Sequence, residues 1–124
     1  MKNTICWTDI PVVNLDRAVA FYSALVATPV AKIKGTAGGP DIGLLPGADA
    51  GASACLYVDP DNAPSAKGPL VYLSVEGRLD SAIRVAAKKG GQLLKKKHQI
   101  GPHGYRALII DSEGNRLALH SMKA

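Results

Sequence analysis

The sequence has few cysteines and few aromatic residues. Its 124 residues include only Cys6 and Cys55, and aromatic residues make up 5% of the chain. Two cysteines are too few for a disulfide framework, and neither belongs to a C-x-x-C pair. Each lies in an apolar, strand-like run, where we expect a small buried thiol. Because nothing indicates disulfide bonds, we expect a reducing, cytoplasmic location.

Long hydrophobic runs and nucleophile motifs are also absent from the sequence. No run approaches the roughly 20 apolar residues that cross a membrane, and the start of the chain lacks the pattern of a signal peptide. We therefore expect no membrane partner. The sequence contains no G-x-S-x-G motif, and the glycines of residues 41–51 lack the spacing of a phosphate-binding loop. It therefore identifies no catalytic residue.

Acidic residues are outnumbered by basic ones. The chain has 15 lysines and arginines against 10 aspartates and glutamates, a net charge of +5. Such an excess can attract acidic ligands or nucleic acid. Here no recognition motif interleaves the charges, and lysines gather at residues 88–89 and 95–97 as on a solvated surface. We expect no nucleic-acid partner, and salt-sensitive binding in a gel shift would contradict this expectation.

The remaining composition is that of one folded domain. Hydrophobic residues make up 47% and charged residues 20% of the chain, as in ordinary globular proteins. A chain of 124 residues buries enough surface to fold without disulfide or metal crosslinks. We therefore expect residues 1–124 to form a single domain.

A loose internal repeat divides this domain into two modules. Residues 7–22 and residues 70–86 both read as a short alternating strand, a polar break, and a helical pattern that begins at Leu-Asp. Apolar residues recur at i, i+3, i+4 and i+7 in both helical patterns. Asn14 is a suitable N-cap for the first helix, and Gly90-Gly91 is a suitable stop for the second.

Three strand candidates follow each predicted helix. They are residues 30–34, 41–45 and 53–58, then residues 92–99, 105–111 and 116–120. A polar, proline-rich linker at residues 59–68 separates module 1, about residues 1–60, from module 2, about residues 69–124. We predict an α+β fold in which two βαβββ modules form a curved eight-stranded mixed sheet with two outer helices.

The last two strands are predicted to form a hairpin. Gly and Asn in the turn at residues 111–115 suit a tight reversal between the strands. Alternation along residues 116–120 then places Arg116, Ala118 and His120 on one face of the sheet and two leucines on the other.

These motifs together resemble the vicinal oxygen chelate superfamily, which includes glyoxalase I, bleomycin-resistance proteins and extradiol dioxygenases. The resemblance rests on three segments in order. The first is Ile10-Pro11-Val12, followed by Leu15-Asp16-Arg17-Ala18 and Phe21-Tyr22. The second is Val71 to Val75 before a helix ending at Gly90-Gly91, and the third is the Asp111-x-x-Gly114-Asn115 turn. It covers nearly the whole chain and implies the two-module fold, often as a homodimer. It does not imply one reaction, since a fold alone does not define function.

In the metal-dependent relatives, His, Glu or Gln side chains at four strand positions bind a divalent metal that polarises substrate oxygens. By resemblance, the matching positions here are Trp7, about Cys55, Leu70 and Ala118. Three of these side chains cannot bind a metal, and one thiolate does not hold a hard ion. We therefore predict no metal and no cofactor.

The resemblance directs attention to the concave face of the sheet for the candidate ligand-binding residues. They are Trp7, Asp9, Cys55, Tyr72, Tyr105 and His120. Structural roles are open for three of them: Trp7 as a core aromatic, Asp9 in an ion pair with Arg116 or a lysine, and His120 bonded to backbone. A zinc site made from His98, His103 and His120 is a further alternative, although a loop separates these residues.

The sequence thus favours a metal-independent small-molecule-binding protein of the glyoxalase/bleomycin-resistance type. The alternative is an enzyme, either a glyoxalase-like lyase or one that uses Asp9 or His120 for proton transfer. The expected partners are a small-molecule ligand and, by resemblance, a second copy of the chain.

Overall fold

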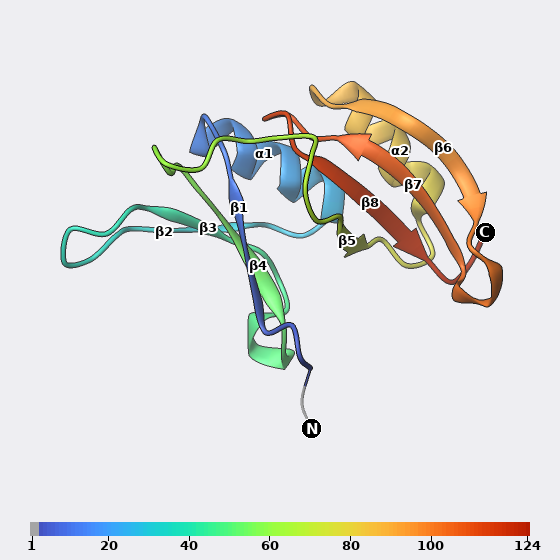
Figure 1. Ribbon diagram of the computed structural model, residues 1–124, viewed down its shortest axis with the longest axis horizontal. Helices are drawn as coiled ribbons and strands as arrows, with labels where there is room; N and C mark the ends of the chain where they lie inside the picture. The colour runs from blue at the N-terminus through green and yellow to red at the C-terminus, as the bar shows by residue number, and fades with distance from the viewer. Residues whose placement is uncertain (1–2) are drawn as a thin grey trace.

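A computed structural model describes residues 3–124 as an α+β fold of two modules, each with the order strand, helix, three strands (Figure 1). Module 1 contains β1 (Trp7–Pro11), α1 (Leu15–Val26), β2 (Ala31–Ile33), β3 (Ile42–Leu44) and β4 (Ser53–Tyr57). Module 2 contains β5 (Val71–Ser74), α2 (Leu79–Lys88), β6 (Gln92–Gln99), β7 (Tyr105–Ile110) and β8 (Arg116–Ser121). Short 3-10 helices lie at Ala48–Ala50 and Gly101–His103. The predicted two-module α+β fold is confirmed.

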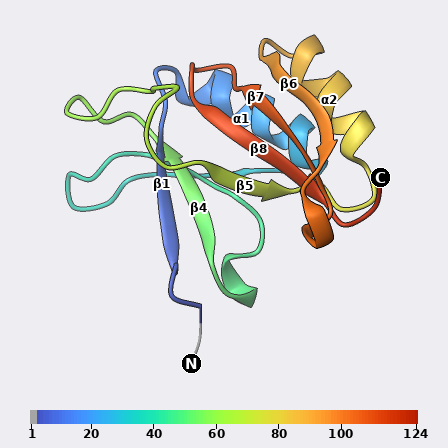
Figure 2. The ribbon, with the colours of Figure 1, turned by 45° about the vertical axis from the view of Figure 1, so that its right-hand side comes forward.

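The strands form two four-stranded mixed sheets, one in each module. Their orders are β1-β4-β3-β2 and β5-β8-β7-β6, so the modules repeat one topology. In each sheet the first strand of the module lies parallel to the last, and the other neighbours are antiparallel. The predicted eight strands are thus present, but their hydrogen bonding divides them between two sheets. Figure 2 shows β1 and β4 on one side of the molecule and β5 to β8 on the other.

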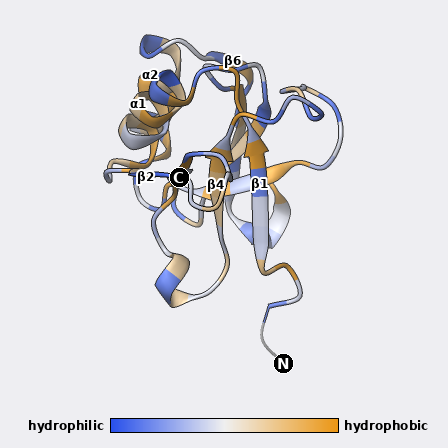
Figure 3. Cartoon of the chain, turned by 90° about the vertical axis from the view of Figure 1, so that its left-hand side faces the viewer, coloured by the Kyte–Doolittle hydropathy of each residue, from blue (hydrophilic) through white to orange (hydrophobic). Residues whose placement is uncertain are grey.

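Both helices lie on the same side of the two sheets and contact one another (Figure 3). Arg78, at the start of α2, donates two hydrogen bonds of 3.0 and 3.1 Å to the carbonyl oxygen of Leu25 in α1. Neither helix, nor any other helical segment within residues 3–124, is long and apolar enough to cross a membrane.

Helix α1 forms as its sequence pattern predicts. The Asn14 side chain accepts a 3.0 Å hydrogen bond from the Arg17 N–H, which satisfies one of the free donors at the helix start. Four residues at helical spacing are buried: Ala18, Phe21, Tyr22 and Leu25. The helix ends at Ala27, whose φ of 55° is left-handed, a conformation that normally favours glycine.

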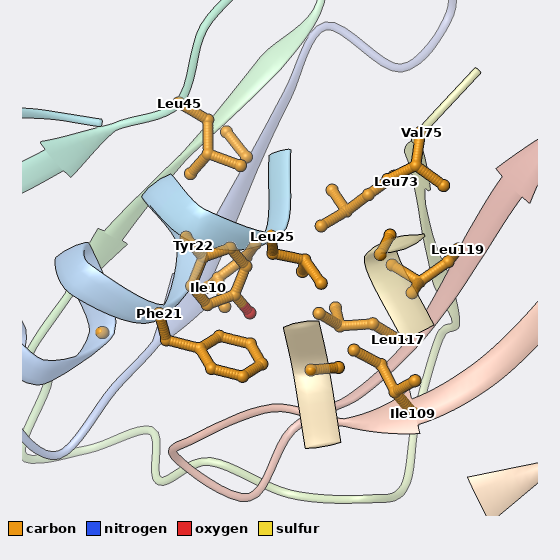
Figure 4. Packing of buried hydrophobic residues seen from close by; sticks show 14 of the residues in the cluster. Ile10, Phe21, Tyr22, Leu25, Leu45, Leu73, Val75, Ile109, Leu117 and Leu119 are labelled. Carbon is orange, nitrogen blue, oxygen red and sulfur yellow. The ribbon is translucent and has the colours of Figure 1, made fainter. Parts of the chain in front are cut away.

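One hydrophobic core joins the two modules. Figure 4 shows Tyr22 and Leu25 of α1 beside Leu73 of β5 and Leu117 of β8, with Ile10 of β1 in the same cluster. Burying side chains of this size contributes roughly 1.5–3 kcal/mol each. Because both modules supply residues to this cluster, they share one core.

The predicted turn at residues 111–115 connects β7 to β8 and also fastens module 2 to module 1. The Glu113 carboxylate accepts hydrogen bonds of 2.8 Å from the backbone N–H groups of Val13 and Asn14, and two more from Arg17. The Asn115 amide donates a 2.7 Å bond to the Pro11 carbonyl. The turn therefore holds the start of β8 against the end of β1.

The two cysteines differ in burial. Cys55 in β4 is buried, as the sequence predicted. The same prediction is wrong for Cys6, which is exposed because β1 begins only at Trp7 and Cys6 precedes it.

Candidate functional site

Each sheet has an open face, turned away from the helices. In module 2, every second residue of the strands packs into the hydrophobic core, as Leu73, Ala107, Leu117 and Leu119 do. The neighbours between them point to the open face of this sheet. These open-face residues include Tyr72 and Ser74 of β5, Arg106 of β7, and Ala118 and His120 of β8.

A hollow of about 540 Å³ lies on this open face. It is lined by Tyr72, Ser74, Ile100, His103, Arg106 and His120. Three strands supply its floor, and the 3-10 helix at Gly101–His103 supplies part of its rim. Its lining combines aromatic and aliphatic surface with hydrogen-bonding groups, the usual chemistry of a small-molecule site.

His120 is held at one side of the hollow with a defined proton position. Its Nε2 lies 2.7 Å from the carbonyl oxygen of His103. A carbonyl oxygen only accepts, so Nε2 carries a proton, and in the neutral ring Nδ1 is then the acceptor. The ring centroid of His120 lies 6.1 Å from that of Tyr72, at an interplanar angle of 59°. His120 therefore makes the predicted hydrogen bond to the backbone and still lines the hollow, so its two predicted roles are compatible.

Arg106 lies opposite His120 in the register between β7 and β8. Its Nε donates a 3.0 Å hydrogen bond to His98 Nε2, and its Nη1 donates to the Tyr72 hydroxyl. Its guanidinium carbon is 5.9 Å from the centre of the Tyr72 ring. The sequence interpretation missed Arg106, although its position beside the buried Ala107 in an alternating strand was a usable signal.

Three of the predicted residues form a separate group on the open face of module 1. Asp9 of β1 pairs in register with Cys55 of β4, and the thiol donates a 3.3 Å hydrogen bond to Asp9 Oδ1. The pKa of the Cys55 thiol is raised, mainly by burial. A hydrogen bond with Trp7 lowers this pKa, and the hydrogen bond and charge of Asp9 raise it. Trp7 is 40% exposed and therefore is not a core aromatic. None of these three residues lines the hollow.

Tyr105 lies apart from both groups, and Asp9 also lines a second cavity. Tyr105 packs against the hydrophobic core from the helix side of its sheet, since it alternates in phase with the buried Ala107. Asp9 lines a crevice of about 220 Å³ between the modules, together with Lys67 and Arg116. Among the ion pairs formed within residues 3–124, none involves Asp9. The structure thus brings together Tyr72 and His120, and, separately, Trp7, Asp9 and Cys55.

The four positions that the resemblance matched to metal ligands do not suit a metal. Ala118 is fully buried beside Tyr72 in the register, and its methyl group has no donor atom. Trp7 and Leu70 also lack donors for a metal, and the Cys55 thiol is hydrogen-bonded to Asp9. Within residues 3–124, no group of three or more His, Cys, Asp or Glu side chains is arranged to hold a metal ion. This includes His98, His103 and His120.

No protein-family model matches the sequence, and no curated protein matches it. Solved structures do match the fold. A glyoxalase/bleomycin resistance protein from Albidiferax ferrireducens T118 has a TM-score of 0.73 at 14% identity, over 96% of this chain and 98% of that one. A protein with the same description from Streptomyces sp. CB03234 has a TM-score of 0.66 at 23% identity, over 94% and 99%.

A genomically encoded fosfomycin resistance protein from Listeria monocytogenes is similar at a TM-score of 0.70 and 12% identity, over 97% of this chain and 91% of that one. These identities are low, so the likeness concerns the arrangement of the backbone. The chain has the fold of the glyoxalase/bleomycin resistance proteins, as the resemblance of its sequence motifs predicted.

Proposed function

We propose that this protein binds a small organic molecule, without a metal ion, in the hollow on the open face of module 2. The observation that carries the proposal is the hollow itself, whose lining includes Tyr72, Arg106 and His120. Tyr72 is 47% exposed and offers both ring surface and a hydroxyl. Solved proteins with this fold are named for resistance to bleomycin and fosfomycin, which supports a role toward small molecules.

Metal independence is part of the proposal because the side chains at the family's ligand positions are unsuitable. A binding protein needs no Lewis acid, whereas the metal-dependent reactions of the superfamily do. Elemental analysis of the purified protein tests this part. Stoichiometric nickel, zinc or iron would contradict it.

The proposal also includes a homodimer, as the family resemblance implies. One chain leaves the open faces of both sheets uncovered, with Trp7 40% and Tyr72 47% exposed. A second copy packed against these faces would cover both aromatic side chains. Sedimentation equilibrium measures the oligomeric state, and a monomer at all concentrations would contradict the dimer.

A substitution that fills the hollow tests the binding function. Ser74 is exposed on the floor of the hollow, so Ser74→Phe should occupy the space that a ligand needs. Ala87→Phe, at an exposed position of α2, adds the same ring elsewhere. We expect hits from a metabolite thermal-shift screen to stabilise the wild type and Ala87→Phe but not Ser74→Phe. Equal stabilisation of all three proteins would place the binding outside the hollow.

The alternative function is an enzyme that uses Asp9 or His120 for proton transfer. Of these two groups, only His120 lines the hollow, and its Nδ1 is available as an acceptor. If a bound compound is turned over, His120→Ala should reduce kcat and Asp9→Ala should not. Unchanged turnover in the double variant would remove both residues from the mechanism.

A further inference from the structure

Arg106 is the one strongly charged group in the lining of the hollow. Arginine carries its charge at every physiological pH and presents five N–H donors in a planar fork. Within residues 3–124, Arg106 forms no ion pair, and its Nη2 donates no hydrogen bond. The charge is thus uncompensated, and part of the fork is free for a ligand.

Neutral neighbours hold the guanidinium in place. His98 Nδ1 lies 3.0 Å from the Lys96 carbonyl oxygen and must donate to it, which leaves His98 Nε2 to accept from Arg106 Nε. The Tyr72 hydroxyl accepts from Arg106 Nη1 on the other side. Two acceptors without formal charge orient the cation but do not neutralise it. This differs from Arg17, whose guanidinium is neutralised by the Glu113 carboxylate at 2.7 Å.

From this arrangement we propose that Arg106 selects small molecules that carry a carboxylate or phosphate group. The anionic group binds the free N–H donors of Arg106, and the apolar part of the ligand lies against the ring of Tyr72. An oriented guanidinium binds planar or tetrahedral oxyanions with charge-assisted hydrogen bonds, which are about twice as strong as neutral ones. The inference rests on the proposed ligand site in the hollow and names the chemical class of its ligand.

A matched pair of probes tests the preference for an anion. Naphthoate and naphthamide share one aromatic frame and differ in charge, so their affinities are compared by titration of the amide NMR signals of Ser74 and His120. We expect wild type to bind naphthoate at least about tenfold more tightly than naphthamide. Inorganic phosphate, titrated alone, shows whether a tetrahedral anion uses the same donors.

Variants of Arg106 assign the preference to its side chain. Arg106→Gln removes the charge and should abolish the preference for naphthoate while the affinity for naphthamide is kept. Arg106→Lys keeps a point charge and should retain part of the preference. Arg84→Gln removes the same charge from an exposed position of α2 and should behave as wild type. Tyr72→Phe removes the hydroxyl that positions Arg106. It should therefore lower the affinity for naphthoate more than the affinity for naphthamide.

The outcomes separate this inference from the proposed function. Equal affinity for the two probes, or a preference that survives Arg106→Gln, overturns the anion assignment and leaves the ligand site in place. Binding of neither probe in the hollow overturns both. A weaker homodimer in both Arg106→Gln and Asp9→Asn, without a preference for naphthoate, would instead assign Arg106 to Asp9 of a second copy.

Discussion

The Glu113 carboxylate provides the sharpest test of how the two modules are held together. Its side chain has no solvent exposure and accepts hydrogen bonds from Val13, Asn14, Arg17 and Ser112. Burial raises the pKa of this carboxyl, but the Arg17 side chain and the backbone and Ser112 donors lower it more, so the pKa falls from 4.5 to about 2. Glu113→Gln removes the charge and keeps the shape.

The size of the effect follows from the change in pKa. A depressed pKa in the folded state means that folding favours the ionised form, and each pKa unit corresponds to about 1.4 kcal/mol. The shift from 4.5 to about 2 is therefore worth roughly 3 kcal/mol of unfolding free energy. This contribution is complete above the unfolded pKa of 4.5 and disappears as the pH falls toward the folded value near 2.

Urea unfolding followed by circular dichroism measures the effect across this pH range. At about pH 7 we expect Glu113→Gln to be less stable than wild type by roughly 2–3 kcal/mol. The difference should shrink steadily below the unfolded pKa, because wild type then loses the same ionised group. Glu76→Gln is the matched control, since Glu76 is exposed and is the only other glutamate in the sequence.

Two results would refute this reasoning. A constant difference between wild type and Glu113→Gln at every pH would mean that shape, not ionisation, accounts for the loss. An equal pH dependence in Glu76→Gln would assign the effect to overall charge.

Two glycine exchanges test local backbone arguments. Ala27→Gly should raise the unfolding free energy by about 0.5–1 kcal/mol, because glycine adopts the φ of 55° at the end of α1 without the steric cost that alanine bears; lower stability in urea unfolding would contradict this. Gly91→Ala should lower the unfolding free energy by about 1–3 kcal/mol, because its added Cβ would lie 2.5 Å from the Ile110 carbonyl oxygen; a thermal melt equal to that of wild type would contradict it.

The elements that the sequence predicted best are those with strong local signals. The helical spacing after Asn14 and the turn before Arg116 each required only neighbouring residues, and both appear as predicted. The alternation of β8 also held, with Ala118 and His120 on the open face. The division into two sheets was not predictable in this way, because it depends on which strands pair across more than 40 residues.

The candidate site was predicted in part, for a related reason. Alternation placed Tyr72 and His120 correctly on an open face, but it did not show that the strands pair into two separate sheets. Trp7 and Asp9 therefore were grouped with Tyr72 and His120, although they lie in different modules. Arg106 was missed because a charged residue in a strand usually indicates a solvated face. Alternation placed it on the open face, but its contacts with Tyr72 and His98 appear only in the structure.

The turn at residues 111–115 has a consequence for the order in which the chain becomes stable during synthesis. The N–H groups of Val13 and Asn14 find their acceptor in a residue 100 and 99 positions later. At about 5–20 residues per second, a ribosome needs roughly 5–20 s to add that length of chain. For this interval the first module exists without the carboxylate that fixes its strand-to-helix corner. Newly made chains should therefore depend most on chaperones before the last hairpin emerges.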